Sequence, residues 1–314
     1  MVTSVTLTGC QRGGEDVLKK TAPRKVFMVF NLIILISLCI SILFPYINIL
    51  AISLNDGNRA IPSGLMVWPR VFTLDNYRAL LADNSIWWSL FVTVGRMVLG
   101  VGLTLFITFI AAYGLTRPGL PFRRTLVMFF FIPSQIAGGL IPTFILFNSL
   151  GLLNNPLVYV LPTGFAFFYY ILFRTYITTI PDSLGESAKI DGANDFTIMW
   201  RIFLPLSAPI IAVIALFTGV FHWNDWTTTL FFMSGTNDWN TLAFELHRVL
   251  TEQQRINALI RAAIEQGTVP EVMRQSMESL KYAQIIITSL PIILLYPFLQ
   301  KYFIKGIMLG GVKE

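Results

Sequence analysis

Arg96 is the residue best suited to contact a charged solute, because it is the only charged side chain in the apolar run 86–116. A buried arginine in a membrane span costs about 2.5–3.5 kcal/mol on insertion scales, so it should face protein groups or a wet cavity. Its guanidinium could pair with a carboxylate of an acidic solute, or donate to backbone carbonyls of neighbouring helices. The residue type alone leaves both alternatives open.

A second set of solute-binding groups is aromatic. Aromatic faces stack on sugar rings, and tyrosine hydroxyls can hydrogen-bond to sugar hydroxyls. The same side chains also pack against lipid or against other helices. The candidates in this chain are Phe165, Phe167, Phe168, Tyr169 and Tyr170.

The segment 180–205 places polar residues at regular spacing between two apolar runs. Ser183 and Glu186 have the S-x-x-E spacing of a capping box, which predicts a helix start. Gly192 predicts the stop of that helix, because glycine adopts the left-handed conformation found there. Asn194 and Asp195 can cap a second helix. We therefore predict two short helices at a sharp angle, with an ordinary interfacial loop as the alternative.

Several kinds of catalytic and metal chemistry have no sequence motif here. The chain contains no G-x-x-x-x-G-K-[ST] phosphate loop and no H-E-x-x-H motif. Its only histidines are His222 and His247, and its only cysteines are Cys10 and Cys39. We therefore predict no catalytic residue and no metal site, and we expect His222 to be a hydrogen-bonding interfacial histidine.

The elements that position these residues must be membrane helices. The chain has 314 residues, of which 54% are hydrophobic and 13% charged, and its mean hydropathy is +0.66. Soluble domains carry about 25% charged residues. This composition argues against a soluble enzyme, a disordered chain and a disulfide scaffold, and indicates an integral membrane protein.

Six apolar segments are long enough to span a bilayer, which requires about 20 residues each. A polar break, Asn148 to Pro156, divides the apolar run 125–173 into two spans. Helices satisfy their own backbone hydrogen bonds in lipid, so we predict an all-α polytopic bundle. The predicted spans are 26–54, 86–116, 125–147, 157–176, 203–224 and 280–300.

Basic residues predict the orientation of the bundle. They are concentrated in residues 1–25, in the loop 117–124 and after residue 300. Because short cytoplasmic loops are rich in Lys and Arg, both termini should face the cytoplasm. The net charge of +6 is thus explained by cytoplasmic loops, and we expect no nucleic-acid partner.

The segment 186–205 also resembles the signature loop of ABC-importer permeases. Glu186-Ser-Ala188, Gly192 and Ile202-x-Leu204-Pro205 follow the spacing E-A-A-x3-G-x9-I-x-L-P, with Ser187 at the second Ala position. Further blocks are similar to the carbohydrate-uptake branch, of the maltose-transporter type, and the resemblance covers about residues 26–314. Those blocks are IPDSLGESAKIDGA with LPLSAP, AAYGLTRPGLPFRR, GGLIPTFILFNSLGLLN, HWNDW and YPFLQKYFIKGIMLGGVKE.

The resemblance implies a type I permease fold and a place in the bacterial inner membrane. The chain would be one permease subunit of an ATP-driven, binding-protein-dependent importer of sugars, and we expect oligosaccharides. Its partners would be a second related permease, two copies of a cytosolic ATPase, an extracytoplasmic sugar-binding protein and membrane lipid. ATP and Mg²⁺ would bind to the ATPase, so this chain would hold no cofactor and would not be an enzyme.

The resemblance also assigns residues to the contact with the ATPase. A loop at about 181–203 would dock on the ATPase, and we call it the coupling loop. Its residues carried over from the family are Glu186, Ser187, Ala188, Asp191, Gly192, Ala193, Ile202, Leu204 and Pro205. For the substrate path we predict Arg96, Gly139, Tyr169, Tyr170 and Asn224.

The chain thus divides into a basic segment 1–25, a permease domain 26–305 and a cytoplasmic tail 306–314. Within the permease domain, an external lobe at about 227–279 shows helical spacing over 241–251 and 252–265, then a helix start at Thr268 and Pro270. The alternatives are an ABC permease for a non-sugar solute and a secondary transporter. A secondary transporter would need intramembrane acids, and no Asp or Glu lies inside a predicted span.

Overall fold

The computed structural model describes residues 22–56, 66–117, 119–233, 238–265 and 279–294. The secondary structure of these residues is helical, apart from one antiparallel bridge between Asn55 and Phe72. The all-α prediction is therefore confirmed. The chain forms two units, residues 1–48 and 49–314, and each is described by itself.

The described part of the first unit is most of α1 (Ala22–Ser53). Val26–Ser53 is long and apolar enough to cross a membrane, in agreement with the span predicted over 26–54. Its apolar side chains from Val26 to Ile47 are largely exposed, as expected for a helix that meets lipid.

The long helix α3 (Asn84–Thr116) organises the second unit, and the short α2 (Asp75–Leu81) precedes it. α3 begins where the Asp83 carboxylate accepts the Ser85 amide at 2.8 Å, which supplies one of the partners that a helix start lacks. This hydrogen bond also lowers the pKa of Asp83. α3 packs against α6 (Phe167–Ile177) and α10 (Ala208–Asn224).

The third predicted span, 125–147, contains two helices rather than one. The structure has α4 (Arg123–Ser134) and α5 (Leu140–Ser149). Pro133 lies at the end of α4, and Gly139, immediately before α5, has a φ of +82°. Because most residues avoid positive φ and glycine does not, Gly139 permits the break between the helices.

The fourth predicted span is also interrupted. It consists of η1 (Pro156–Tyr159), η2 (Leu161–Thr163) and α6, with a bend of 46° before α6. Pro162 lacks an amide hydrogen and breaks the helical hydrogen-bond ladder. The hydroxyl of Thr104 on α3 donates to the Thr163 carbonyl at 2.9 Å, so a carbonyl at this break is satisfied by a neighbouring helix.

The coupling loop contains α7 (Ser183–Ile190), α8 (Asp195–Ile198), the π-helical turn η3 (Met199–Phe203) and α9 (Leu204–Leu206). The segment Asp195–Leu206 meets α10 at an angle of 75°. Within the fifth predicted span, 203–224, the long apolar helix α10 therefore starts at Ala208. Residues 203–206 belong to the arm before the bend.

The region after α10 contains α11 (Thr227–Phe232), α12 (Leu242–Glu265) and the helix Ser279–Leu294. α12 is one continuous helix, which confirms the helical spacing predicted over 241–265. The predicted helix start at Thr268 and Pro270 lies outside the described residues.

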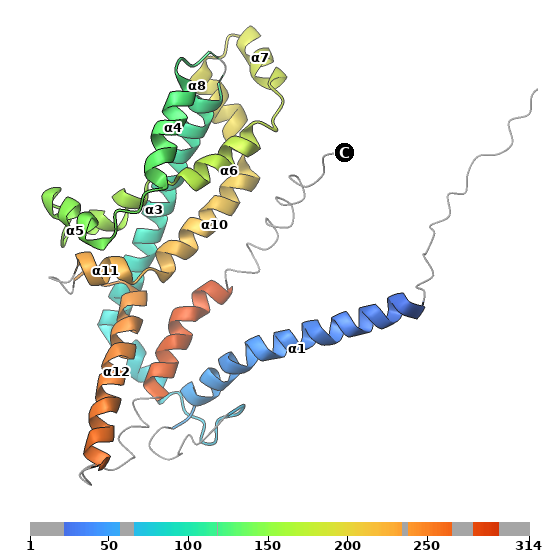
Figure 1. Cartoon of the computed structure of the whole chain (residues 1–314). Coiled ribbons are helices and arrows are strands. Elements are labelled where there is room, and N and C mark those ends of the chain that lie inside the picture. Colours follow the sequence, from blue (N-terminus) through green and yellow to red (C-terminus); the bar gives the residue numbers. More distant parts are fainter. Residues whose placement is uncertain (1–21, 57–65, 118, 234–237, 266–278, 295–314) are drawn as a thin grey trace, which may run out of the picture. The chain divides into compact units, whose positions relative to one another are not determined.

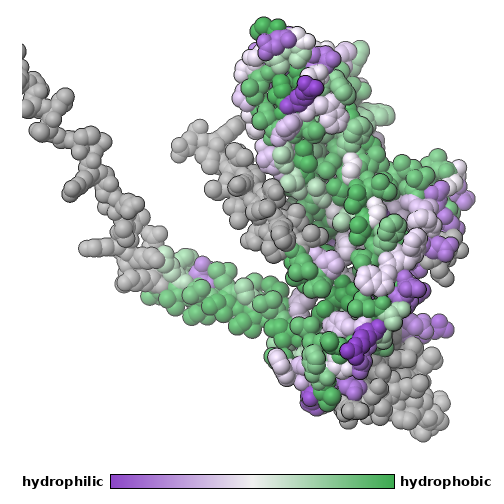
Figure 2. Space-filling view, turned by 180° about the vertical axis from the view of Figure 1, so that it is seen from behind, coloured by the Kyte–Doolittle hydropathy of each residue, from purple (hydrophilic) through white to green (hydrophobic). Residues whose placement is uncertain are grey.

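Within the described residues, α1 and α3 each contain a stretch long and apolar enough to cross a membrane. The number of candidate spans is four if each of two bent helix pairs forms one span. These pairs are η1–η2 with α6, and Asp195–Leu206 with α10. α5 and Ser279–Leu294 are shorter apolar helices, so the count of six stays a prediction. In Figure 2, hydrophobic residues cover much of the middle of the unit 49–314, and hydrophilic residues gather toward its ends.

The core that supports the coupling loop lies between α3, α6, η3 and α10. Phe109, Phe173, Phe203 and Ile214 contribute one fully buried side chain from each of these elements. Figure 1 shows α7 and α8 at the same end of this unit as the last turns of α3 and the first turns of α4. The core therefore joins the coupling loop to three apolar helices.

Gly100 provides a test of the α3–α10 contact. A methyl group there would overlap the buried ring of His222, whereas a methyl group at Gly102 would meet nothing within 4 Å. Overpacking costs about 1–3 kcal/mol, so Gly100→Ala should lower the unfolding temperature in detergent. Gly102→Ala makes the same change in helix propensity and should not. Equal unfolding temperatures for the two variants would contradict this packing.

Candidate functional site

The start of α7 differs from the prediction. Ser183 is the first residue of the helix, and the preceding Asp182 makes no side-chain capping bond. Asp182 itself has helical dihedral angles, and its carbonyl accepts the Glu186 amide at 3.1 Å. The predicted capping box of Ser183 and Glu186 was therefore wrong, and the Glu186 carboxylate makes no bond at the helix start.

The end of α7 agrees with the prediction. Gly192 has a φ of +82°, its amide donates to Lys189 O at 3.0 Å, and the Ala193 amide donates to Ala188 O at 2.9 Å. This pair of bonds is the Schellman motif, which satisfies carbonyls at a helix end and requires a left-handed residue. Gly192 therefore sets where α7 stops and how the chain turns.

The second helix starts as predicted. The Asn194 side chain accepts the Thr197 amide at 2.7 Å, and Lys189 on α7 pairs with Asp195 on α8 at 2.8 Å. This ion pair is exposed, so it contributes at most about 1 kcal/mol. The two short helices are thus joined by a tight turn and one surface ion pair.

The predicted coupling residues separate into an exposed group and a buried group. Glu186, Ser187, Asp191 and Gly192 are exposed. The partly buried residues, which pack against the core of α3, α6 and α10, are Ala188, Ala193, Ile202 and Leu204. Pro205 is exposed on α9. One face of the loop is therefore accessible while the other is anchored.

Arg96 is buried and bonded to other residues of the chain. Its side chain forms an ion pair with Asp225, donates to the Asp225 carbonyl at 2.9 Å, and lies 4.6 Å from the Tyr159 ring. Its Nε atom is 3.4 Å from Nδ1 of His222. These are contacts between neighbouring helices, the second of the two alternatives, and substrate contact by Arg96 stays a prediction.

Asp225 was missed by the sequence analysis. Besides pairing with Arg96, its carboxylate accepts the Thr227 and Thr228 amides at 3.0 and 3.1 Å, at the start of α11. The signal was a single acid directly after the apolar run that contains His222. His222 is fully buried and hydrogen-bonded, so its predicted bonding is correct but its surroundings are the bundle interior.

A chain of buried hydroxyl groups continues from this ion pair toward α12. Tyr159 Oη lies 3.0 Å from Thr229 Oγ1, which lies 3.0 Å from Thr241 Oγ1. Thr93 on α3 accepts the Leu242 amide at 2.8 Å. Buried polar groups that are satisfied in this way hold elements in one geometry, so α11 and the start of α12 are fixed to α3.

The other predicted path residues are dispersed. Tyr170 is buried in the core beside Phe167, and its hydroxyl has no hydrogen-bond partner. Tyr169 is half-buried, Gly139 lies before α5, and Asn224 is exposed and donates to Val220 O at 2.9 Å. The described structure does not bring these four residues together.

An aromatic cavity of about 700 Å³ lies between α4 and α6. Three of the aromatic candidates named from the sequence, Phe165, Phe167 and Phe168, line it. Its polar lining residues are Ser134 and Gln135, which hydrogen-bond to each other at 3.0 Å. The sequence analysis missed these two, although they are a polar pair inside the apolar run 125–147.

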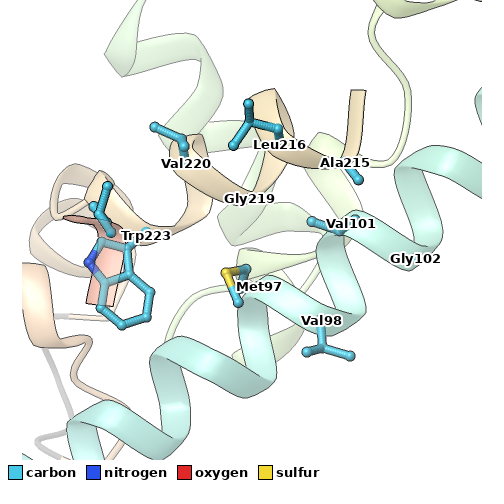
Figure 3. Close-up of a pocket in the computed structure, with 10 residues that line it drawn as sticks. Met97, Val98, Val101, Gly102, Ala215, Leu216, Gly219, Val220 and Trp223 are labelled. Carbon is cyan, nitrogen blue, oxygen red and sulfur yellow. The ribbon is translucent and has the colours of Figure 1, made fainter. Parts of the chain in front are cut away.

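A second cavity, of about 430 Å³, is almost wholly apolar. Figure 3 shows Met97, Val98 and Val101 of α3 opposite Leu216 and Trp223 of α10. Among the described residues that line it, one side chain is a hydrogen-bond donor. This is the Trp223 indole, which already donates to Thr288 O at 3.1 Å. Sites for polar ligands need a few oriented polar groups, so this cavity does not provide the groups that would recognise a sugar.

No metal chemistry is suggested by the part of the chain that the structure describes. There, no group of three His, Cys, Asp or Glu side chains could hold a metal ion. The arrangement instead offers an exposed, anchored loop at one end of a helix bundle.

Comparisons with known proteins agree with this arrangement. Residues 104–308 match the family described as "Binding-protein-dependent transport system inner membrane component". The chain is 36% identical, over 86% of its length and 92% of the relative's, to the Polygalacturonan/rhamnogalacturonan transport system permease protein YtcP of Bacillus subtilis (strain 168).

Two solved structures are similar as well. One is a chain of a bacterial ABC transporter involved in the import of the acidic polysaccharide alginate, with a TM-score of 0.77 and 28% identity over 90% of this chain and 98% of that one. Another is a chain of a bacterial alginate ABC transporter in complex with an alginate pentasaccharide-bound periplasmic protein. At 14% identity and a TM-score of 0.55, over 91% of this chain and 96% of that one, it shares the fold alone. The chain therefore belongs to the family of inner membrane components of binding-protein-dependent transport systems.

Proposed function

We propose that this chain is one permease subunit of an ATP-driven importer of acidic oligosaccharides. The observation that best supports this function is the position of α7, with Glu186 and Ser187 exposed while Ala188 packs on the core. A helix held in this way can bind a partner on one face and pass its movement to the bundle on the other. The partner would be a cytosolic ATPase that binds ATP and Mg²⁺.

The complex would contain this chain, a second related permease and two copies of the ATPase. An extracytoplasmic binding protein would deliver the sugar, and both termini of this chain would face the cytoplasm. Binding of ATP and of the loaded binding protein would each favour one state of the bundle, because a ligand shifts an equilibrium only by its differential affinity for the two states.

The substrate class rests on the relatives and on the aromatic cavity. Polygalacturonan and alginate, named for two relatives, are both acidic polysaccharides. The lining of the α4–α6 cavity offers aromatic faces with Ser134 and Gln135, and includes no Asp or Glu to repel a uronate. We propose that this cavity contributes to the substrate path. Arg96 already pairs with Asp225, so the proposed path through this cavity does not depend on Arg96.

Affinity purification from the native membrane is the first test. Copurification of this chain, a second permease and an ATPase in a ratio of one to one to two would support the proposed complex. The complex is then reconstituted in vesicles with the copurifying binding protein and labelled trigalacturonate. We expect uptake that requires ATP and falls to background when Mg²⁺ is removed with a chelator.

The controls separate the alternatives. A neutral arabinotriose of similar size tests the acidic substrate class, and its uptake at an equal rate would contradict that class. ATP-dependent uptake of neither sugar would favour a non-sugar solute. Uptake without ATP that is driven by an ion gradient would overturn the importer and support a secondary transporter.

A further inference from the structure

We propose that Arg117 is a positioning residue that fixes the coupling helix α7 to the end of α3. Arg117 directly follows α3. Its guanidinium carbon lies 4.1 Å from the ring centroid of Tyr113 and 4.2 Å from that of Phe203. One planar cation therefore lies against aromatic rings from both α3 and η3.

The guanidinium also reaches α7. A Cβ atom placed on Gly185 would lie 3.7 Å from Nη1 of Arg117 and 3.7 Å from the Phe203 ring. Gly185 is the buried residue of α7, so Arg117 lies close to the backbone of this helix. A cavity of about 170 Å³ beside it is lined by Arg117, Asp182, Gly185, Glu186, Lys189 and Asp195.

The bonding of Arg117 indicates that stacking is its main interaction. Its Nε atom is buried and has no hydrogen-bond partner among the residues that the structure describes. Asp195, the acid on α8 beside it, is paired with Lys189. Cation–π contacts strengthen when the cation is desolvated, and the flat guanidinium stacks on rings in a way that the lysine ammonium does not. The shape of arginine, rather than its charge alone, is therefore what this position requires.

The consequence is a direct mechanical connection. α3 also carries Arg96 and Thr93, through which it is bonded to Asp225 and to the start of α12. With Arg117 in place, a displacement of α7 acts on α3, the helix that is bonded to Asp225 and to the start of α12. This inference rests on the proposed function, because α7 must be moved by an ATPase for the connection to matter in transport.

Arg117→Lys is the decisive variant, and Arg124→Lys is its matched control. Arg124 is an exposed arginine in the first turn of α4, seven residues along the chain. Both changes keep the charge. In vesicles containing the whole complex, with trigalacturonate as the probe, Arg117→Lys should lower the sugar imported per ATP hydrolysed about tenfold. Arg124→Lys should leave this ratio unchanged. An equal ratio for the two variants would overturn the role of Arg117.

A double-mutant cycle separates positioning from a general loss of stability. Phe203→Leu keeps an apolar side chain and removes one of the two rings. If Arg117 acts through that ring, the double variant Arg117→Lys, Phe203→Leu should be little worse than either single variant. If the double variant instead shows the product of the two single losses in sugar imported per ATP hydrolysed, the contact between Arg117 and the Phe203 ring would be contradicted.

A spin label tests the same connection without any sugar. Cys10 and Cys39 are replaced by serine, and Ser187→Cys carries the label on the exposed side of α7. Arg117→Lys should narrow the spectrum of the label, because α7 becomes more mobile, and Arg124→Lys should not. Unchanged label mobility would refute the positioning role, whereas failure of the wild-type complex to import with ATP would refute only the proposed function.

Discussion

Arg96→Ala is expected to destabilise the protein by about 3–5 kcal/mol, because it leaves the buried Asp225 carboxylate without its cation inside the bundle. It also removes the hydrogen bond to the Asp225 carbonyl and the contact with the Tyr159 ring. The yield of folded protein in the membrane and its unfolding temperature in detergent should both fall sharply.

The matched control removes both charges together. Asp225→Asn keeps an oxygen that can accept the Thr227 and Thr228 amides, so α11 retains its start. In Arg96→Met, Asp225→Asn no charge is left unpaired, and replacing a buried pair in this way is often nearly neutral. We expect most of the stability to return.

The same double variant tests whether Arg96 contacts the substrate. Normal uptake of trigalacturonate by this variant would show that Arg96 is structural. A specific loss of uptake of the acidic sugar, with normal stability, would restore Arg96 to the substrate path. Arg96→Ala protein that is as stable as the wild type would contradict the ion pair itself.

Gly192→Pro is expected to abolish import while the protein still reaches the membrane. Proline fixes φ near −65° and has no amide hydrogen, whereas Gly192 has a φ of +82° and donates to Lys189 O. The turn after α7 cannot form, so α7 should lose its orientation. Import per ATP hydrolysed should fall by more than about tenfold, which corresponds to about 1.4 kcal/mol of coupling.

Conservative changes at Gly192 separate backbone geometry from side-chain contact. Asparagine adopts positive φ more readily than other non-glycine residues, so Gly192→Asn should retain most of the import. Gly192→Val should not, because a β-branched residue is strained at this φ. Equal import by the Asn and Val variants would contradict the role of the left-handed turn.

Glu186→Lys tests the exposed face of the same helix. Glu186 makes no capping bond, so the folding of α7 does not depend on its carboxylate. Reversal of its charge should weaken copurification with the ATPase and leave the unfolding temperature of this chain unchanged. Normal copurification and normal import would show that Glu186 does not contact the ATPase.

The local structure of the coupling loop was largely readable from residue types. Gly192 and Asn194 act through their own backbone and the next few residues, and short-range rules of this kind need no tertiary information. The capping box was the exception. Ser183 and Glu186 have the required spacing, but Asp182 already has helical dihedral angles, so Ser183 lies inside the helix and not at its cap.

Long-range partners could not be read in this way. Arg96 and Asp225 are 129 residues apart, and Arg117 and Phe203 are 86 apart by their numbering. A lone charge in an apolar run shows that a partner must exist, because an unpaired charge in a bundle is costly, but it does not identify the partner. Packing of α3 against α10 and η3 decided both pairs.

The sequence by itself determined the helical class, because only helices satisfy the backbone in so apolar a chain, and it determined the family through the spacing around Glu186, Gly192 and Pro205. The tertiary structure decided where the apolar runs break. Gly139 has a φ of +82° between α4 and α5, and at the break near Pro162 the Thr104 hydroxyl of α3 satisfies the Thr163 carbonyl. It also decided the surroundings of Arg96: the contact of α3 with α10 and the turn after it brings Asp225 to this arginine.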